Sequence, residues 1–224
     1  MAIGGDVQLR QAYPEAQVTD LGEVALLPGL VNVHSHLELT LLRGRLERSD
    51  FRGWIGELIA LKAERLTVDD LLVSAQMGCL EAIRAGVTTL ADTADAPTPL
   101  MALTESGLRG IVYQECFGPD PAQVEPALDQ LQRKLEAHDQ FLASCTPPVT
   151  GRVRVGISPH APYSVSASLY QRVTRWASEQ RFDLALHAAE SRDEWQLLAD
   201  GGGRFRRVAA DPPDPLYPPG LLAG

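Results

Sequence analysis

The 224-residue sequence has little of what several classes of protein require. It contains three cysteines, far apart and with no Cys-x-x-Cys pair, so neither a disulfide framework nor a cysteine zinc clip is indicated. No apolar run is long enough to span a bilayer, and the first residues do not show the basic-then-apolar pattern of a secretory signal. These absences predict a reduced protein of the cytoplasm.

Positive charge is also scarce. The formal net charge is −9, and Lys62 and Lys134 are the only lysines. An acidic chain repels phosphate backbones and anionic membrane surfaces, so nucleic acid and membrane are poor candidates for partners. The glycine-rich turns G-x-G-x-x-G and G-x-x-x-x-G-K are missing too, which disfavours a nucleotide cofactor. The sequence does not determine the oligomeric state, and a homo-oligomer is among the candidates.

What the sequence does have is an alternation of short apolar runs with helical periods. Strands are expected at residues 24–27, 30–36, 87–92, 111–117, 153–157 and 184–187, and helices at 54–66, 67–85, 97–106, 122–142, 166–177 and 194–198. Strands that alternate with helices imply a parallel sheet covered by helices, either a closed eight-stranded barrel or an open doubly wound sheet. Without a phosphate-binding turn the α/β barrel is favoured.

Polar residues gather where these strands end, which is where a barrel carries its functional residues. They are His34, His36, Asp92, Glu115, His160 and His187. His34 and His36 are two apart and therefore project from one face of a strand, which suits two neutral imidazoles that bind one metal ion. The plainer alternative is that such histidines are hydrogen-bonded core residues. His138 falls in a polar helix and is expected on the solvated surface.

A carboxylate follows the last of these histidines at a spacing of three, as Glu190. Near a metal-activated water, such a group can carry a proton to a substrate and on to a leaving group. Alternatively, Glu190 is an ordinary acid at the start of a helix, because acidic residues favour the first turn.

Four motifs in order resemble the amidohydrolase superfamily, in its branch of cytosine-deaminase-like deaminases and chlorohydrolases. They are PGLVNVHSH at 28–36, GVTT at 86–89, SPHAPY at 158–163 and HAAE at 187–190. Within that branch, YQECFGP at 113–119 and residues 158–166 resemble the aminofutalosine deaminases of the menaquinone pathway.

The resemblance implies a distorted (β/α)8 barrel with one divalent metal ion, zinc or iron. It makes His34, His36 and His187 metal ligands, Glu190 the general acid/base, and His160 a residue that faces the substrate. Glu115 is assigned to substrate binding as well. No lysine lies between residues 141 and 182, where binuclear relatives carry a carboxylated lysine, so one metal ion fits. From charge and position, Arg43 or Arg45 is a candidate for contact with a substrate carboxylate.

The implied reaction is hydrolytic deamination of an adenine-type nucleoside, a purine-like small molecule. The expected substrate is aminodeoxyfutalosine, converted to futalosine and ammonia. A triazine-type chlorohydrolase or another nucleoside or base deaminase is the alternative within the same metal frame. A non-catalytic fragment that binds a metal or a partner is the alternative from a different class.

The sequence departs from the family after His187. The family has a histidine on the sixth strand and an aspartate on the eighth, whereas no histidine occurs after His187. We expect about five of eight βα units, with residues 1–27 a remnant of a small β domain and 28–224 an incomplete barrel. A truncated member with little activity of its own is therefore expected.

Overall fold

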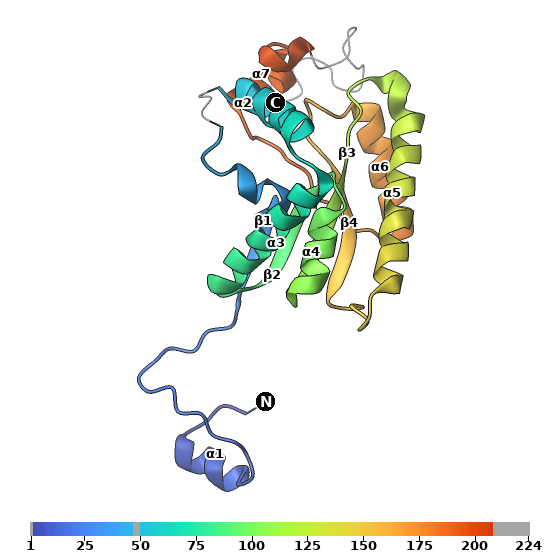
Figure 1. Ribbon diagram of the computed structural model, residues 1–224. Coiled ribbons are helices and arrows are strands. Elements are labelled where there is room, and N and C mark those ends of the chain that lie inside the picture. The colour runs from blue at the N-terminus through green and yellow to red at the C-terminus, as the bar shows by residue number, and fades with distance from the viewer. Residues whose placement is uncertain (1, 47–49, 208–224) are drawn as a thin grey trace.

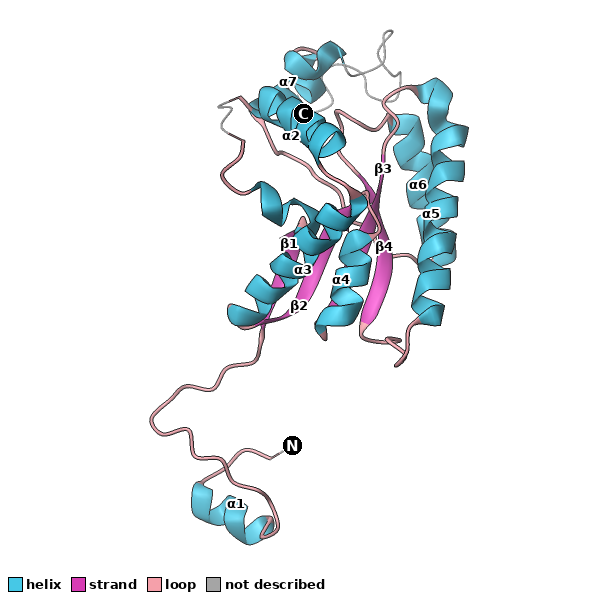
Figure 2. Ribbon diagram, viewed as in Figure 1, coloured by secondary structure: helices cyan, strands magenta, loops and turns pink. Residues whose placement is uncertain are grey.

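The computed structural model describes residues 2–46 and 50–207. Strands and helices alternate through most of this part of the chain (Figures 1 and 2). The strands are β1 (Leu30–Ser35), β2 (Val87–Ala94), β3 (Arg109–Cys116) and β4 (Val153–Pro159). The α-helices are α1 (Asp6–Ala12), α2 (Phe51–Arg65), α3 (Val68–Arg84), α4 (Thr98–Ser106), α5 (Val124–Ser144), α6 (Ala167–Gln180) and α7 (Arg192–Asp200). Short 3-10 helices are η1 (Leu37–Leu42), η2 (Pro121–Gln123) and η3 (Arg204–Arg207).

The four strands form one parallel sheet in the order β1-β2-β3-β4. Helices cover one face of it: α3 contacts β2, α4 and α5 contact β3, and α6 contacts β4. Parallel strands with helices along one face are a segment of a (β/α)8 barrel. The partial barrel expected from the sequence is confirmed.

Local signals place the helices where they were expected. Thr67 caps α3 through a capping box, in which its hydroxyl accepts from Asp70 N–H and the Asp70 carboxylate accepts from Thr67 N–H. Gly86 follows α3 with φ +80°, a left-handed conformation that glycine adopts without strain. Ser166 caps α6 by accepting from Leu169 N–H.

Apolar side chains on the helix-covered face make two adjoining cores. In one, Leu90 and Val112 pack with residues of α3 and α4; in the other, Ile157 packs with residues of α5 and α6. The opposite face corresponds to the interior of a barrel. There the ring of Tyr113 lies where a side chain at Gly156 would collide with it, so the glycine makes room for the ring.

The fifth strand expected at residues 184–187 is wrong as stated. Leu184 makes only an isolated parallel bridge with Ile157, although Ile157 N–H donates to Asp183 O and Ala185 N–H donates to Ile157 O. The segment therefore follows the edge of β4 without becoming a regular ladder. Leu184 and Leu186 stay 40% and 53% exposed, so side-chain packing adds little to hold them.

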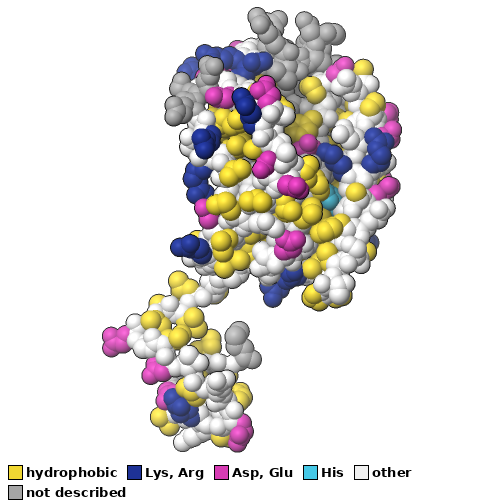
Figure 3. Space-filling view, in the orientation of Figure 1, with side chains coloured by type: hydrophobic (Ala, Val, Ile, Leu, Met, Phe, Trp, Pro, Cys, Tyr) yellow, Lys and Arg dark blue, Asp and Glu magenta, His cyan; other side chains and the backbone are white. Residues whose placement is uncertain are grey.

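The expected strand at residues 24–27 is not formed either. Residues 2–29 contain helix α1 and otherwise extended chain, which projects from the sheet (Figure 1). A strand needs a hydrogen-bonded neighbour, and no strand in the described residues pairs with this segment. Its apolar residues, among them Val24, Leu26 and Leu27, are exposed, as the yellow side chains on this arm in Figure 3 illustrate. The division between a β-domain remnant and a barrel at residue 27 stays a prediction.

His138 was expected on the surface, and this is wrong. Its side chain is buried between α5 and β3, where its Nε2 lies 2.7 Å from Gln114 Oε1. The polar residues around it in sequence face solvent, while His138 falls on the buried stripe of α5 with Leu131 and Leu135. None of the described helices is long and apolar enough to cross a membrane.

Candidate active site

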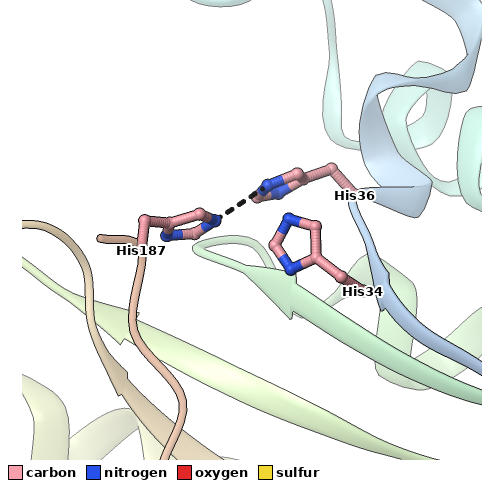
Figure 4. Close-up of side chains that lie close together, drawn as sticks. All are labelled: His34, His36 and His187. Atoms are coloured by element: carbon pink, nitrogen blue, oxygen red, sulfur yellow. Dashed lines mark hydrogen bonds between the residues drawn. The ribbon is translucent and has the colours of Figure 1, made fainter. Parts of the chain in front are cut away.

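Three histidines meet at the carboxyl end of the sheet, two from the end of β1 and one from the segment between α6 and α7 (Figure 4). The ring centroids of His34, His36 and His187 are 5.0 to 5.2 Å apart. One potential ligand nitrogen from each lies within 4.8 Å of the other two. The structure thus brings together the three residues predicted to bind a metal ion.

The hydrogen bonds of two of these rings fix which nitrogen carries the proton. His36 Nδ1 is 2.7 Å from Thr93 O, and His187 Nδ1 is 3.2 Å from His160 O. A carbonyl oxygen only accepts, so both Nδ1 atoms donate, and each neutral ring keeps its lone pair on Nε2. These two Nε2 atoms are 3.2 Å apart (Figure 4). Two lone pairs this close fit a shared cation, and backbone carbonyls at the other ring nitrogens are the usual support for metal-binding histidines.

The electrostatic surroundings favour the uncharged form of two of these imidazoles, His34 and His36. Burial, with the charges of His187 and His34 next, lowers the pKa of His36 to about 4. Burial and then His187 also lower the pKa of His34, while the negative charge of Glu190 opposes that change. Neutral imidazole is the form that binds metal ions.

The turn after β1 is held by a buried aspartate at the end of β2. Asp92 Oδ1 accepts from Leu37 N–H at 2.7 Å and from the Ser35 hydroxyl at 2.8 Å. Burial raises the pKa of Asp92 to about 8. Asp92 alternates with the inward-facing residues of β2 and does not join the histidines. Its contacts position the residues on either side of His36.

Glu190 lies just outside α7 and close to the histidines. Ser191 caps that helix, so Glu190 precedes it, and the acid in the first turn that binds backbone is Glu194. The Glu194 carboxylate accepts from Ala189 N–H and Glu190 N–H at 2.9 and 2.7 Å, which holds Ala189 at φ +60°. The Tyr163 hydroxyl donates to Glu190 Oε2 at 2.8 Å. Backbone and side chain of Glu190 are thus both fixed, as a proton-transfer group requires.

Glu115, which is buried, and His160, which is half-buried, lie at the ends of β3 and β4 and form a second pair beside His187. Glu115 Oε1 is 3.8 Å from His160 Nε2 and has no hydrogen-bond partner among the described residues. Burial, then the charge of Glu38, raises the pKa of Glu115 to about 8. Burial, then His187, lowers the pKa of His160 to about 3.

Two charged residues of this region, Glu38 and Lys62, were not identified from the sequence. Glu38 is 3% exposed and pairs with Lys62 of α2, while its Oε2 has no partner in the described structure. The charge of Lys62 bears on both His36 and Glu115. A signal was available, because Glu38 is two residues after His36 and Lys62 is one of only two lysines.

Arg43 is on the surface and already paired. Its guanidinium donates to both carboxylate oxygens of Glu81 of α3, at 3.0 and 2.6 Å. This ion pair raises the pKa of Arg43. No described contact joins Arg43 to the histidines, so contact with a substrate carboxylate would need the guanidinium to leave Glu81.

Comparison with known proteins finds a family whose sequence pattern this chain matches. The profile of the Amidohydrolase family matches residues 25–209. The 5-methylthioadenosine/S-adenosylhomocysteine deaminase of Nitratidesulfovibrio vulgaris is 32% identical over 200 residues, which cover 87% of this chain and 43% of that protein. The chain therefore spans less than half the length of this relative.

Two solved structures share the fold. Helicobacter pylori aminofutalosine deaminase, in complex with methylthio-coformycin, superposes with a TM-score of 0.76 at 23% identity, over 91% of this chain and 47% of that one. Zinc-complexed atrazine chlorohydrolase from Arthrobacter aurescens gives 0.61 at 21% identity, over 81% and 45%. The profile match extends from before β1 to beyond α7 and includes the histidine cluster. The chain belongs to the amidohydrolase family.

Proposed function

We propose that this chain carries the metal-binding and proton-transferring part of a hydrolytic deaminase for adenine-type nucleosides. The proposal depends above all on the opposed Nε2 atoms of His36 and His187, which are 3.2 Å apart and which both carry a lone pair when the neutral rings donate through Nδ1. Glu190 lies close enough to influence the pKa of His34. The deaminase names of the relative from Nitratidesulfovibrio vulgaris and of the Helicobacter pylori structure support the same reaction.

His34, His36 and His187 would hold one divalent cation, each through one ring nitrogen. Zinc is our first choice, because the chlorohydrolase of the same fold was solved with zinc, and iron is the second. When bound by imidazoles with a coordination position open, such a cation lowers the pKa of a water toward neutrality and so supplies the nucleophile. The carbonyls of Thr93 and His160 orient two of the rings in advance.

Glu190 would move the protons of the reaction. It would take a proton from the attacking water and pass it to a ring nitrogen of the base. The exocyclic amine would then receive the proton of the newly added hydroxyl group and leave as ammonia, while the carbon keeps the oxygen as a carbonyl. Tyr163 donates to one carboxylate oxygen and leaves the other for this task. The ring of Phe117, which is 42% exposed, lies 4.9 Å from that of His160, centroid to centroid, and offers flat apolar surface to a base.

For the substrate we propose a purine nucleoside, with aminodeoxyfutalosine of menaquinone biosynthesis first and 5′-methylthioadenosine next. His160 and Glu115 would face the base, and Arg43 would exchange Glu81 for a carboxylate where the substrate has one. The cytoplasm is the proposed compartment. Turnover by the 224 residues alone is expected to be weak, because no histidine follows His187 to match the sixth-strand ligand of the family.

Binding therefore tests the proposal better than turnover does. We expect the zinc-loaded chain to bind methylthio-coformycin in isothermal titration calorimetry, and to lose that binding when a chelator removes zinc. Glu190→Gln should weaken binding at least about tenfold, since it removes a charge-assisted hydrogen bond. Glu179→Gln on the exposed side of α6 is the matched control and should bind as the parent does. Equal affinity with and without metal would contradict the proposal.

A further inference from the structure

Glu115 and His160 face each other across a gap that no described residue bridges. Their Oε1 and Nε2 atoms are 3.8 Å apart, beyond the length of a hydrogen bond. Glu115 is 8% exposed, and its Oε1 is shielded from solvent without a partner. A buried unpaired acceptor costs free energy unless a ligand provides a donor.

The proton of the neutral His160 ring is on Nδ1, while Nε2 is the nitrogen that faces Glu115. His160 Nδ1 is 2.6 Å from the Ser164 hydroxyl oxygen, and that hydroxyl donates to Ala161 O at 3.1 Å. A hydroxyl has one hydrogen, so Nδ1 is the donor in the first contact and Nε2 keeps a lone pair. A carboxyl group has an acceptor oxygen in either charge state. Glu115 can therefore turn an acceptor oxygen toward the gap that the His160 lone pair also faces.

These acceptors lie next to the proposed metal site. A carboxylate oxygen of Glu115 and one nitrogen each of His160 and His187 are all within 4.8 Å of one another. A group held between Glu115 and His160 would thus be a neighbour of an atom bound at His187 Nε2. The ring of Phe117 beside His160 leaves apolar surface for the flat part of such a ligand.

A second cation fits this gap less well than a hydrogen-bond donor of a ligand does. His187 has one free ring nitrogen, because its Nδ1 donates to His160 O. If that nitrogen serves the cation bound with His34 and His36, only Glu115 and His160 remain for another ion. Two protein ligands are fewer than the three or four of ordinary zinc sites.

We propose that Glu115 and His160 accept the two N–H donors of the exocyclic amine on the substrate ring, and thereby select an amine over a halide as the leaving group. This inference rests on the proposed deaminase function. An amino group satisfies both acceptors, whereas chlorine at the same carbon has no hydrogen and leaves both unpaired. When water adds and the carbon–nitrogen bond breaks, the departing ammonia keeps N–H groups for the same two acceptors.

The test compares two probes that differ only at this position, 5′-methylthioadenosine and its 6-chloro counterpart, on the zinc-loaded chain. We expect calorimetry to show at least about tenfold tighter binding of the amino compound, the loss typical of a buried acceptor left unpaired. Glu115→Gln keeps a carbonyl acceptor and should keep most of this preference. Glu115→Leu and His160→Phe should each reduce it to within about twofold. An unchanged preference in Glu115→Leu would overturn the proposal.

Two further measurements separate this inference from the proposed function. Adenine and 6-chloropurine repeat the comparison without ribose. If no nucleoside binds but Glu115→Leu abolishes a preference for adenine, the nucleoside assignment fails and the amine site stands. Zinc affinity is measured for every variant. A loss of zinc affinity in Glu115→Leu with an unchanged amine preference would make Glu115 a metal ligand and overturn the inference.

Discussion

Neighbouring residues of β3 face two histidines on opposite sides of the sheet, the buried His138 and the half-buried His160, with opposite outcomes. On the helix-covered side, His138 Nε2 is 2.7 Å from Gln114 Oε1, and Gln114 Nε2 reaches the carbonyls of Ala94, Asp95 and Glu115. On the inner side, Glu115 Oε1 and His160 Nε2 stay 3.8 Å apart, and the described residues give Glu115 Oε1 no hydrogen-bond partner. His138 and Gln114 form a hydrogen bond with each other, whereas Glu115 and His160 lack a hydrogen-bond donor between them.

This difference separates a structural histidine, His138, from one that we propose to be functional, His160. His138 and Gln114 satisfy each other, so their contribution is to the stability of the α5–β3 contact. The unpaired Glu115 oxygen and the opposed lone pairs of His36 and His187 are costs that folding alone does not offset. Sites that bind ligands accept such costs, because the ligand removes them.

The largest effect is expected at the proposed metal site. His36→Ala should lower the affinity of the chain for zinc by more than about a hundredfold, since losses of supporting contacts alone cost 10- to 100-fold in metal sites. His138→Ala, the change at the paired histidine, should leave zinc affinity unchanged. Competition titration with a zinc-sensitive dye measures both. Similar zinc affinity in both variants would remove the distinction between the two kinds of histidine.

A smaller effect is expected on the free energy of unfolding, and here the change at His138 matters while the change at Glu115 does not. His138→Leu leaves buried Gln114 Oε1 without its donor and should lower the free energy of unfolding by about 1–3 kcal/mol. Glu115→Leu removes an acceptor that has no partner and should leave stability unchanged or raise it. Urea denaturation of the metal-free proteins, followed by circular dichroism, measures both. If Glu115→Leu destabilised the chain as much as His138→Leu, Glu115 would be a structural residue.

Much of this arrangement could be predicted from the sequence, because its signals are local. The spacing of His34 and His36 on an apolar run, the capping box at Thr67 and Gly86 after α3 each act within a few residues. Parallel strands bring their carboxyl ends to one edge, so the convergence of the strand-end residues also followed from the alternating pattern.

The parts that were missed depend on contacts distant in sequence. His138 is flanked by polar residues, and only the packing of α5 against β3 buries it beside Gln114. Residues 184–187 have the composition of a strand, but a ladder needs continued pairing, and only Leu184 bridges to Ile157. The burial of Glu38 depends on Lys62 of α2, a partner that no local pattern identifies.

The smallest effect concerns pH and again separates the two sides of β3. Burial, then Lys134, lowers the pKa of His138 in the folded chain, while Asp139 acts the other way. The unfolded chain then binds a proton more readily, so the stability from neutral His138 is complete above about pH 6.5 and is lost as pH falls toward the folded pKa. His138→Gln has no titrating ring and should lose less stability over that range. Other groups titrate there too, among them Glu115 and Asp92 with raised pKa values, but they are common to both proteins. The difference between the two unfolding curves, measured from pH 7.5 to 5, therefore reports His138. A difference that does not change with pH would mean that the folded chain holds the His138 proton as readily as the unfolded chain does.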